Sequence, residues 1–196
     1  MSVTRSKSKA AFTALGIALA AVVVLFAGCG NHKGDKGVPM NTTVTESAAR
    51  ERITAYFLDT LRALPPGVGL SRTPQNPDLS AFKDDAAISV PCDDNNDDPR
   101  KPEQAQLAYW VVGVPAGQDS HYFELIRNYW TGRGFRLNPD SDSRWAAVWT
   151  QDGYSLSVKN AGKGDGSLSV GAGSPCFPKS AAGTTTPQPT QLRRPS

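Results

Sequence analysis

Residues 107–114 read LAYWVVGV, an almost unbroken run of apolar side chains rich in β-branched and aromatic residues. A run of this kind is typical of a strand in the middle of a sheet, and its lack of polar alternation predicts burial on both faces. Downstream, Tyr154, Leu156 and Val158 alternate with polar residues, which predicts a strand with one buried and one wet face. Further strands are expected at 87–90, 135–137, 145–150 and 168–170.

Two helices are expected around these strands. Between Thr45, a capping residue, and the Pro-Pro-Gly stop at 65–67, apolar side chains recur every three or four residues. A second apolar stripe follows Asp119 or Ser120 as cap and ends at the glycines 132 and 134. The order helix, strand, helix and antiparallel meander predicts an α+β fold: an antiparallel sheet of about four to five strands with two helices packed on one face.

The termini differ from this central part. Residues 1–28 carry Arg5, Lys7 and Lys9 and no acid, followed by an uncharged apolar stretch from residue 10, the layout of a secretory signal peptide. The predicted organisation is a signal peptide at 1–28, a flexible tether at 29–44, a single domain at 45–178 and a disordered Thr/Pro/Gln-rich tail at 179–196. Removing the three basic residues of the signal from the 21 in the chain leaves 18, which balance the 18 acidic residues. This balance argues against a nucleic-acid partner.

The apolar stretch ends in Leu25-Phe26-Ala27-Gly28-Cys29, which resembles a bacterial lipobox, although Phe26 stands where leucine is usual. The resemblance implies a lipoprotein that is cut before Cys29, carries diacylglyceryl on the Cys29 thiol, and in many hosts carries a further acyl chain such as palmitate. Two or more chains give durable anchoring. The alternative is an uncleaved signal anchor. Both interpretations place the rest of the chain outside the cytoplasm, on the outer face of the cell membrane.

Cys92 and Cys176 remain once Cys29 is used for lipid. Two thiols in an exported domain predict one structural disulfide. A redox-active pair would require Cys-x-x-Cys, which is absent.

Other candidate sites match their motifs poorly. The acidic run 93–98 has the oxygen ligands that calcium prefers but lacks the glycine and the bidentate acid of an EF-hand, so no metal or cofactor is expected. Ser80-x-x-Lys83 lacks the further elements of penicillin-binding enzymes, and the glycine-rich 162–167 lies between expected strands rather than before a helix. His121 follows Asp119 and Ser120 directly in sequence, whereas a catalytic triad converges from separate segments.

Aromatic side chains are abundant between residues 109 and 154. Trp145 and Trp149 have the same parity on one expected strand, so their rings should project from the same face. An exposed strip of Trp110, Trp130, Trp145 and Trp149 would form a ligand or partner surface. The alternative is that these rings fill the core beneath the helices.

The plan as a whole resembles small actinobacterial cell-envelope lipoproteins of the LppA-like kind. The resemblance rests on the lipobox, the helix ending at 61–67 (LRALPPG), the distant cysteine pair and the closing Gly173-Ser174-Pro175-Cys176. It implies location and fold and supplies no catalytic residues. We therefore expect a non-catalytic module that binds an envelope protein, glycan or lipid. The alternatives are a small hydrolase or transferase that uses His121 with Asp119 or Glu124, and a carrier with a long apolar cavity for an acyl or prenyl chain.

Overall fold

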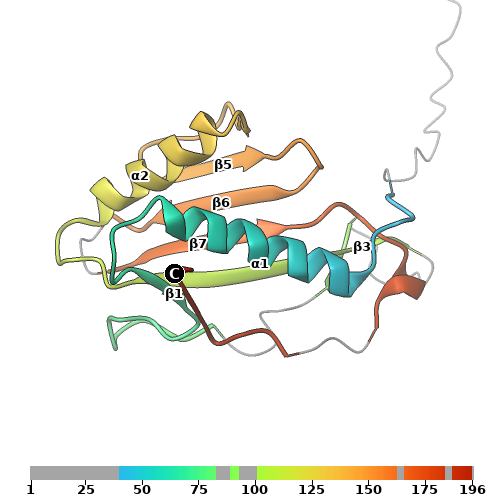
Figure 1. Ribbon diagram of the computed structural model, residues 1–196, viewed down its shortest axis with the longest axis horizontal. Coiled ribbons are helices and arrows are strands. Elements are labelled where there is room, and N and C mark those ends of the chain that lie inside the picture. Colours follow the sequence, from blue (N-terminus) through green and yellow to red (C-terminus); the bar gives the residue numbers. More distant parts are fainter. Residues whose placement is uncertain (1–39, 83–88, 93–100, 163–165, 184–186, 196) are drawn as a thin grey trace, which may run out of the picture. The chain divides into compact units, whose positions relative to one another are not determined.

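The first six residues of the apolar run, 107–112, lie in β3 (Glu103–Val112), a ten-residue strand in the interior of the sheet (Figure 1). The computed structural model describes residues 40–82, 89–92, 101–162, 166–183 and 187–195. Strand β3 ends just before Gly113, whose φ of 81° lies in the left-handed region that favours glycine.

Eight antiparallel strands form one sheet in the described part of the chain, in the order β4-β5-β6-β7-β3-β1-β8, with β2 also paired to β3. Besides β3 they are β1 (Gly69–Ser71), β2 (Ser89–Pro91), β4 (Arg136–Leu137), β5 (Trp145–Trp149), β6 (Ser155–Asn160), β7 (Leu168–Gly173) and β8 (Gln191–Arg193). The sheet is larger than the four to five strands expected. Strands β1 and β8 are not among those expected, because they have only three residues each, too few to show a period. The strand expected at 87–90 corresponds to β2.

Helices α1 (Glu46–Arg62) and α2 (Asp119–Gly132) lie on the same face of the sheet (Figure 1), so the predicted α+β class is confirmed. Thr45 caps α1 as expected, because its Oγ1 accepts a hydrogen bond from the Ala48 N–H at 3.2 Å. The cap expected for α2 is wrong by one residue. Gln118 is the N-cap there and makes no side-chain capping bond.

The core lies between the helices and the sheet. Buried side chains of α1 and α2 meet the odd-numbered residues of β3 and the inward residues of β5, β6 and β7. Among the largest are Phe57, Tyr109, Phe123 and Trp130. The Trp130 indole N–H donates to Thr60 Oγ1 at 2.9 Å, which satisfies a polar group that is fully buried between the two helices.

The prediction that the 107–114 strand is buried on both faces is wrong. Burial alternates along β3, with Leu107, Tyr109 and Val111 buried and the residues between them partly exposed. The helices cover one face of the strand. On the other face, the described residues include Phe82, which stacks on Trp110.

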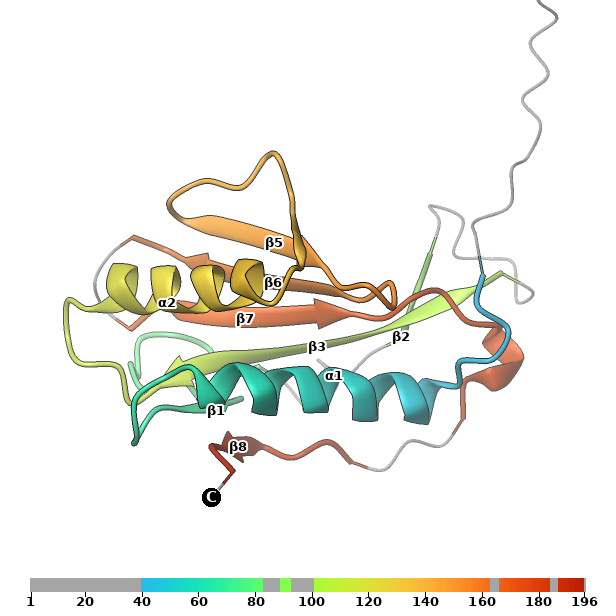
Figure 2. The ribbon, with the colours of Figure 1, turned by 45° about the horizontal axis from the view of Figure 1, so that its top comes forward.

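The prediction of a disordered tail at 179–196 is also wrong for 179–183 and 187–195, the part of it that the structure describes. A short 3-10 helix spans Lys179–Ala181. Farther along the chain, the Thr54 hydroxyl of α1 donates to the Gln188 side-chain oxygen at 3.3 Å, and β8 pairs with β1 (Figure 2). Leu192 is the only large aliphatic side chain in this Thr/Pro/Gln-rich stretch, and it is 5 % exposed. One buried side chain gives no periodic signal, which is why composition alone predicts disorder here.

Candidate functional site

The face of the sheet opposite the helices is the strongest candidate for a functional surface. No helix or strand of the described ranges covers it. The residues on this face of the sheet are identified by the alternation of side chains along each strand and by the register between strands. Trp149, Ser155 and Gly173 form one cross-strand row over β5, β6 and β7, and Ala147, Ser157 and Gly171 form the next row.

The floor of this surface is made of very small residues. Ser155 pairs with Gly173, and Ser157 pairs with Gly171. A Cβ atom at either glycine would lie 3.0 Å from the hydroxyl oxygen of its serine partner, which is tighter than an ordinary contact. The glycines therefore allow the serine side chains to lie flat across β7. We call this floor, formed by Ser155, Ser157, Gly171 and Gly173, the sheet trough.

Larger side chains stand on both sides of the sheet trough. On the β5 side, Trp145 and Trp149 project from the same face, as predicted, and both are partly exposed. The guanidinium of Arg136 lies 4.4 Å from the ring centroid of Trp149, a cation–π contact that covers the indole on one side. On the β3 side, Phe82 stacks on Trp110 with their ring centroids 5.0 Å apart. The Trp110 indole N–H donates to the Ser80 carbonyl oxygen at 3.1 Å.

Part of the sheet trough is a hollow of about 460 Å³. Besides the four floor residues it is lined by Phe82, Gln104, Gln106, Leu107, Ala108 and Ala172. None of these lining residues carries a charge or titrates near neutral pH. The lining can therefore form hydrogen bonds through hydroxyl and amide groups beside an aromatic ring. These groups suit ligand binding, and none of them is a general acid or base.

The predicted aromatic surface is thus partly wrong. Trp145 and Trp149 lie on the uncovered face, and Trp110 lies there beneath Phe82. Trp130 does not belong to that surface, because it is 0 % exposed and lies in the core on the helix side. Its place on the inward stripe of α2, one helical turn after Ile126, explains its burial.

The predicted disulfide is confirmed. Cys92, directly after β2, is bonded to Cys176, which follows β7, and the two Cα atoms are 6.2 Å apart. The bond joins the edge strand β2 to the end of the central meander. It lies beside the Glu103–Phe177 bridge, in which both backbone N–H groups donate to the partner's carbonyl oxygen.

The residues of the alternative hydrolytic site are not brought together. His121 is exposed, and its ring contacts Tyr122. Asp119 is buried and accepts a hydrogen bond from the Gly166 N–H at 3.1 Å, while Glu124 pairs with Arg127. The side chain of Ser120 binds the Asn160 amide.

Several predicted features lie outside the described residues: the signal segment, Cys29 and most of the tether, Lys83, the acidic run 93–98, and positions 163–165 of the glycine-rich loop. Within the described ranges, no group of three or more His, Cys, Asp or Glu side chains is placed to hold a metal ion. No helix of those same ranges is long and apolar enough to cross a membrane. The space where an acyl-chain carrier would need a cavity, between helices and sheet, is occupied by the packed core.

No known protein family, characterised protein or solved structure matches this chain.

Sequence reasoning missed the sheet trough, although a signal for it is present. In 155–159 and 168–173 the outward positions are Ser, Ser and Lys on one strand and Ser, Gly and Gly on the next. Apart from the lysine, these outward residues are small, and small outward residues on two adjacent strands indicate a depression in the sheet surface. Recognising it requires the register of β6 against β7, which the sequence does not supply.

Proposed function

We propose that the chain is a membrane-anchored extracytoplasmic lipoprotein, and that its folded part is a non-catalytic module that binds a neutral glycan in the sheet trough. The sheet trough itself carries this proposal. It combines a flat floor of small residues, partly exposed indole rings at its side and an uncharged lining. The lipobox-like ending at Cys29 supports the anchor, and the disulfide between Cys92 and Cys176 fits an oxidising compartment.

The chemistry of the lining favours a glycan over the other partners. Aromatic faces pack against apolar faces of a ligand, while hydroxyl and amide groups bond to its polar rim. Ser155 and Ser157 each offer a donor and acceptors, and Gln104 and Gln106 add amide groups. A sugar chain presents C–H faces and hydroxyls in the same alternating way. An acyl chain would leave these hydroxyls and amides without partners, at a cost of about 1–3 kcal/mol for each group that becomes buried.

The dimensions agree with an extended ligand. The strands that carry the flanking residues, β5 and β3, are separated by the two floor strands β6 and β7. With neighbouring strands about 4.8 Å apart, the two flanks stand roughly 14 Å from each other. A single sugar chain laid along the floor strands fits this width.

The binding test uses the full-length lipoprotein in a neutral detergent, titrated calorimetrically with N-acetylchitohexaose and cellohexaose. Gly171→Val places a branched side chain on the floor and should weaken binding at least tenfold, and Trp149→Ala should weaken it about tenfold. Leu137→Ala is the matched control, because Leu137 is an exposed apolar residue (39 %) outside the trough. Circular dichroism confirms that each variant is folded.

Three outcomes decide the matter. Saturable binding that Gly171→Val removes and Leu137→Ala retains supports a glycan-binding module. Equal affinity of the wild type and Gly171→Val, or no binding of either sugar, overturns the glycan assignment. The anchor is tested separately by the intact mass of the chain from an actinobacterial membrane fraction. A mass of residues 29–196 plus lipid supports it, and an unlipidated full-length mass refutes it.

A further inference from the structure

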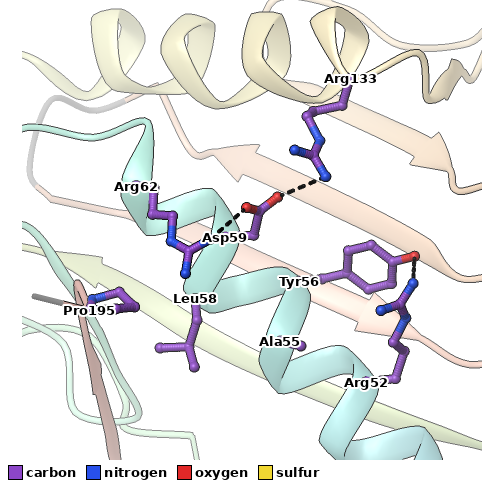
Figure 3. Close-up of a pocket in the computed structure, with 8 residues that line it drawn as sticks. All are labelled: Arg52, Ala55, Tyr56, Leu58, Asp59, Arg62, Arg133 and Pro195. Carbon is purple, nitrogen blue, oxygen red and sulfur yellow. Dashed lines mark hydrogen bonds and ion pairs between the residues drawn. The ribbon is translucent and has the colours of Figure 1, made fainter.

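A second hollow lies on the other side of the sheet, between the outer sides of the two helices (Figure 3). It measures about 350 Å³, within the range of small-molecule sites. We call it the arginine cleft, because Arg52 and Arg62 of α1 and Arg133, the C-cap of α2, line it together with Ala55, Tyr56, Leu58, Asp59 and Pro195.

The carboxylate of Asp59 forms ion pairs with two of these arginines. Arg62 Nη1 lies 3.5 Å from Asp59 Oδ1, and Arg133 Nη2 lies 3.5 Å from Asp59 Oδ2. Figure 3 shows the two guanidinium groups approaching Asp59 from different helices. Both separations exceed the 2.7–2.9 Å of a charge-assisted hydrogen bond, so each guanidinium retains most of its donors for another acceptor.

The charges in the cleft do not balance. Arg52 is held by Asp152, with Nε 2.9 Å from Oδ2, and by the Tyr56 hydroxyl. Among the described residues, Arg62 and Arg133 have only Asp59 as an acidic partner, which leaves one net positive charge in this group of three side chains. Their side chains are 62 % and 51 % exposed, so an incoming anion can reach both.

Helix stability explains only part of this arrangement. Arg62 lies in the last turn of α1 and Arg133 caps α2, and a cation at either place stabilises the negative end of its helix. Asp59 is also in the last turn of α1, where a carboxylate is unfavourable. Burial raises the pKa of Tyr129, and the hydrogen bond from Tyr129 to the Asp59 carboxylate raises it further, so Asp59 has a third partner beside the two arginines. Asp59 therefore brings the guanidinium groups of Arg62 and Arg133 close to each other, although its charge destabilises the C-terminal end of α1.

We propose that the arginine cleft binds a phosphate group. The phosphate would lie between the guanidinium groups of Arg62 and Arg133, which Asp59 contacts only at 3.5 Å. Guanidinium forks match the geometry of phosphate oxygens and bind two of them at a time. The phosphate could belong to a lipid headgroup or to a free phosphate compound, since both present the same oxygens. This site lies on the helix side of the sheet and does not depend on the sheet trough.

The test uses the full-length lipoprotein in dodecyl maltoside at low salt, titrated with inorganic phosphate and separately with glycerophosphoglycerol, a soluble phosphodiester headgroup. Arg62→Gln and Arg133→Gln should each lower the affinity at least tenfold. Asp59→Asn should raise it several-fold, because the internal competitor for the arginines loses its charge. Arg127→Gln is the matched control: Arg127 lies on the same helix as Tyr129 but pairs with Glu124 outside the cleft, so the affinity should not change.

Binding of glycerophosphoglycerol at least as tight as that of inorganic phosphate identifies a lipid headgroup as the source. Binding of inorganic phosphate alone identifies a free phosphate compound. The absence of saturable binding, or equal affinity in wild type, Arg62→Gln and Arg133→Gln, overturns the proposal. A thermal melt of each variant verifies folding, and the opposite sign expected for Asp59→Asn cannot arise from a loss of stability.

Discussion

Leu192→Ala tests the ordered tail most directly. Leu192 is 5 % exposed, lies opposite Leu70 in the β1–β8 pair and belongs to the core cluster. Truncation to alanine removes about three buried carbons, worth roughly 0.8 kcal/mol each. Leucine-to-alanine changes in cores cost about 2–5 kcal/mol, and an edge strand can relax into part of the space. We therefore expect a loss of about 2 kcal/mol in the free energy of unfolding.

The assay is urea unfolding followed by circular dichroism and tryptophan fluorescence, on the oxidised protein. The loss should lower the urea midpoint, and in a thermal melt of the same variant a loss of about 2 kcal/mol should lower Tm by roughly 4–8 °C in a domain of this size. Gln191→Ala is the control, because Gln191 is the exposed neighbour in the same strand and should change stability little. If Leu192→Ala and Gln191→Ala both leave stability unchanged, β8 does not form and the sequence-based expectation of a disordered tail is correct.

Three further changes probe other parts of the fold. Replacing both Cys92 and Cys176 by serine should lower the unfolding free energy by up to roughly 4–5 kcal/mol, the value for a closed loop of this length, and equal urea midpoints would contradict it. Burial acts to raise the pKa of Asp152, but the hydrogen bonds from Tyr56, Thr150 and Arg52 outweigh it and the pKa is lowered. Its stabilisation is present above the unfolded pKa of ~3.9 and is lost as pH falls through the lower folded pKa. Asp152→Asn should therefore cost about 1 kcal/mol at pH 7, and this cost should shrink as the pH is lowered below ~3.9, measured by thermal melts; a pH-independent difference would refute this. Gly113→Ala should cost about 2–3 kcal/mol in urea unfolding, because φ is 81° and the added Cβ would lie 2.4 Å from the Gly67 oxygen, whereas Gly132→Ala meets no atom within 4 Å and should be neutral or stabilising.

The elements that could be predicted from the sequence are those with a repeated signal. The buried face of α1 repeats over five turns, and Leu156 and Val158 of β6 alternate with exposed or partly exposed residues. The elements that could not be predicted depend on partners distant in sequence. Strand β1 has only Gly69, Leu70 and Ser71, and it is a strand because it pairs with β3 on one side and β8 on the other. Tertiary pairing, rather than local propensity, determines such short segments.

The two candidate sites illustrate the same limit. Trp145 and Trp149 could be assigned to one face from their spacing, but whether helices cover that face depends on which side of the sheet α1 and α2 occupy. The arginine cleft is even harder to predict from the sequence. Asp59 and Arg133 are 74 positions apart, and nothing in either segment indicates that they meet across two helices.

The two sites should respond differently to salt, and this difference separates them in a single experiment. The hollow of the sheet trough is lined by uncharged residues, so the affinity for N-acetylchitohexaose should change less than twofold between low and physiological ionic strength. Arg62 and Arg133 are more than half exposed, and interactions of exposed charges are screened by salt. Phosphate affinity should therefore fall several-fold over the same range in wild type, and by less in Arg133→Gln. Equal salt dependence for the two ligands would mean that they share one surface, and the assignment of separate chemistries to the two faces would be wrong.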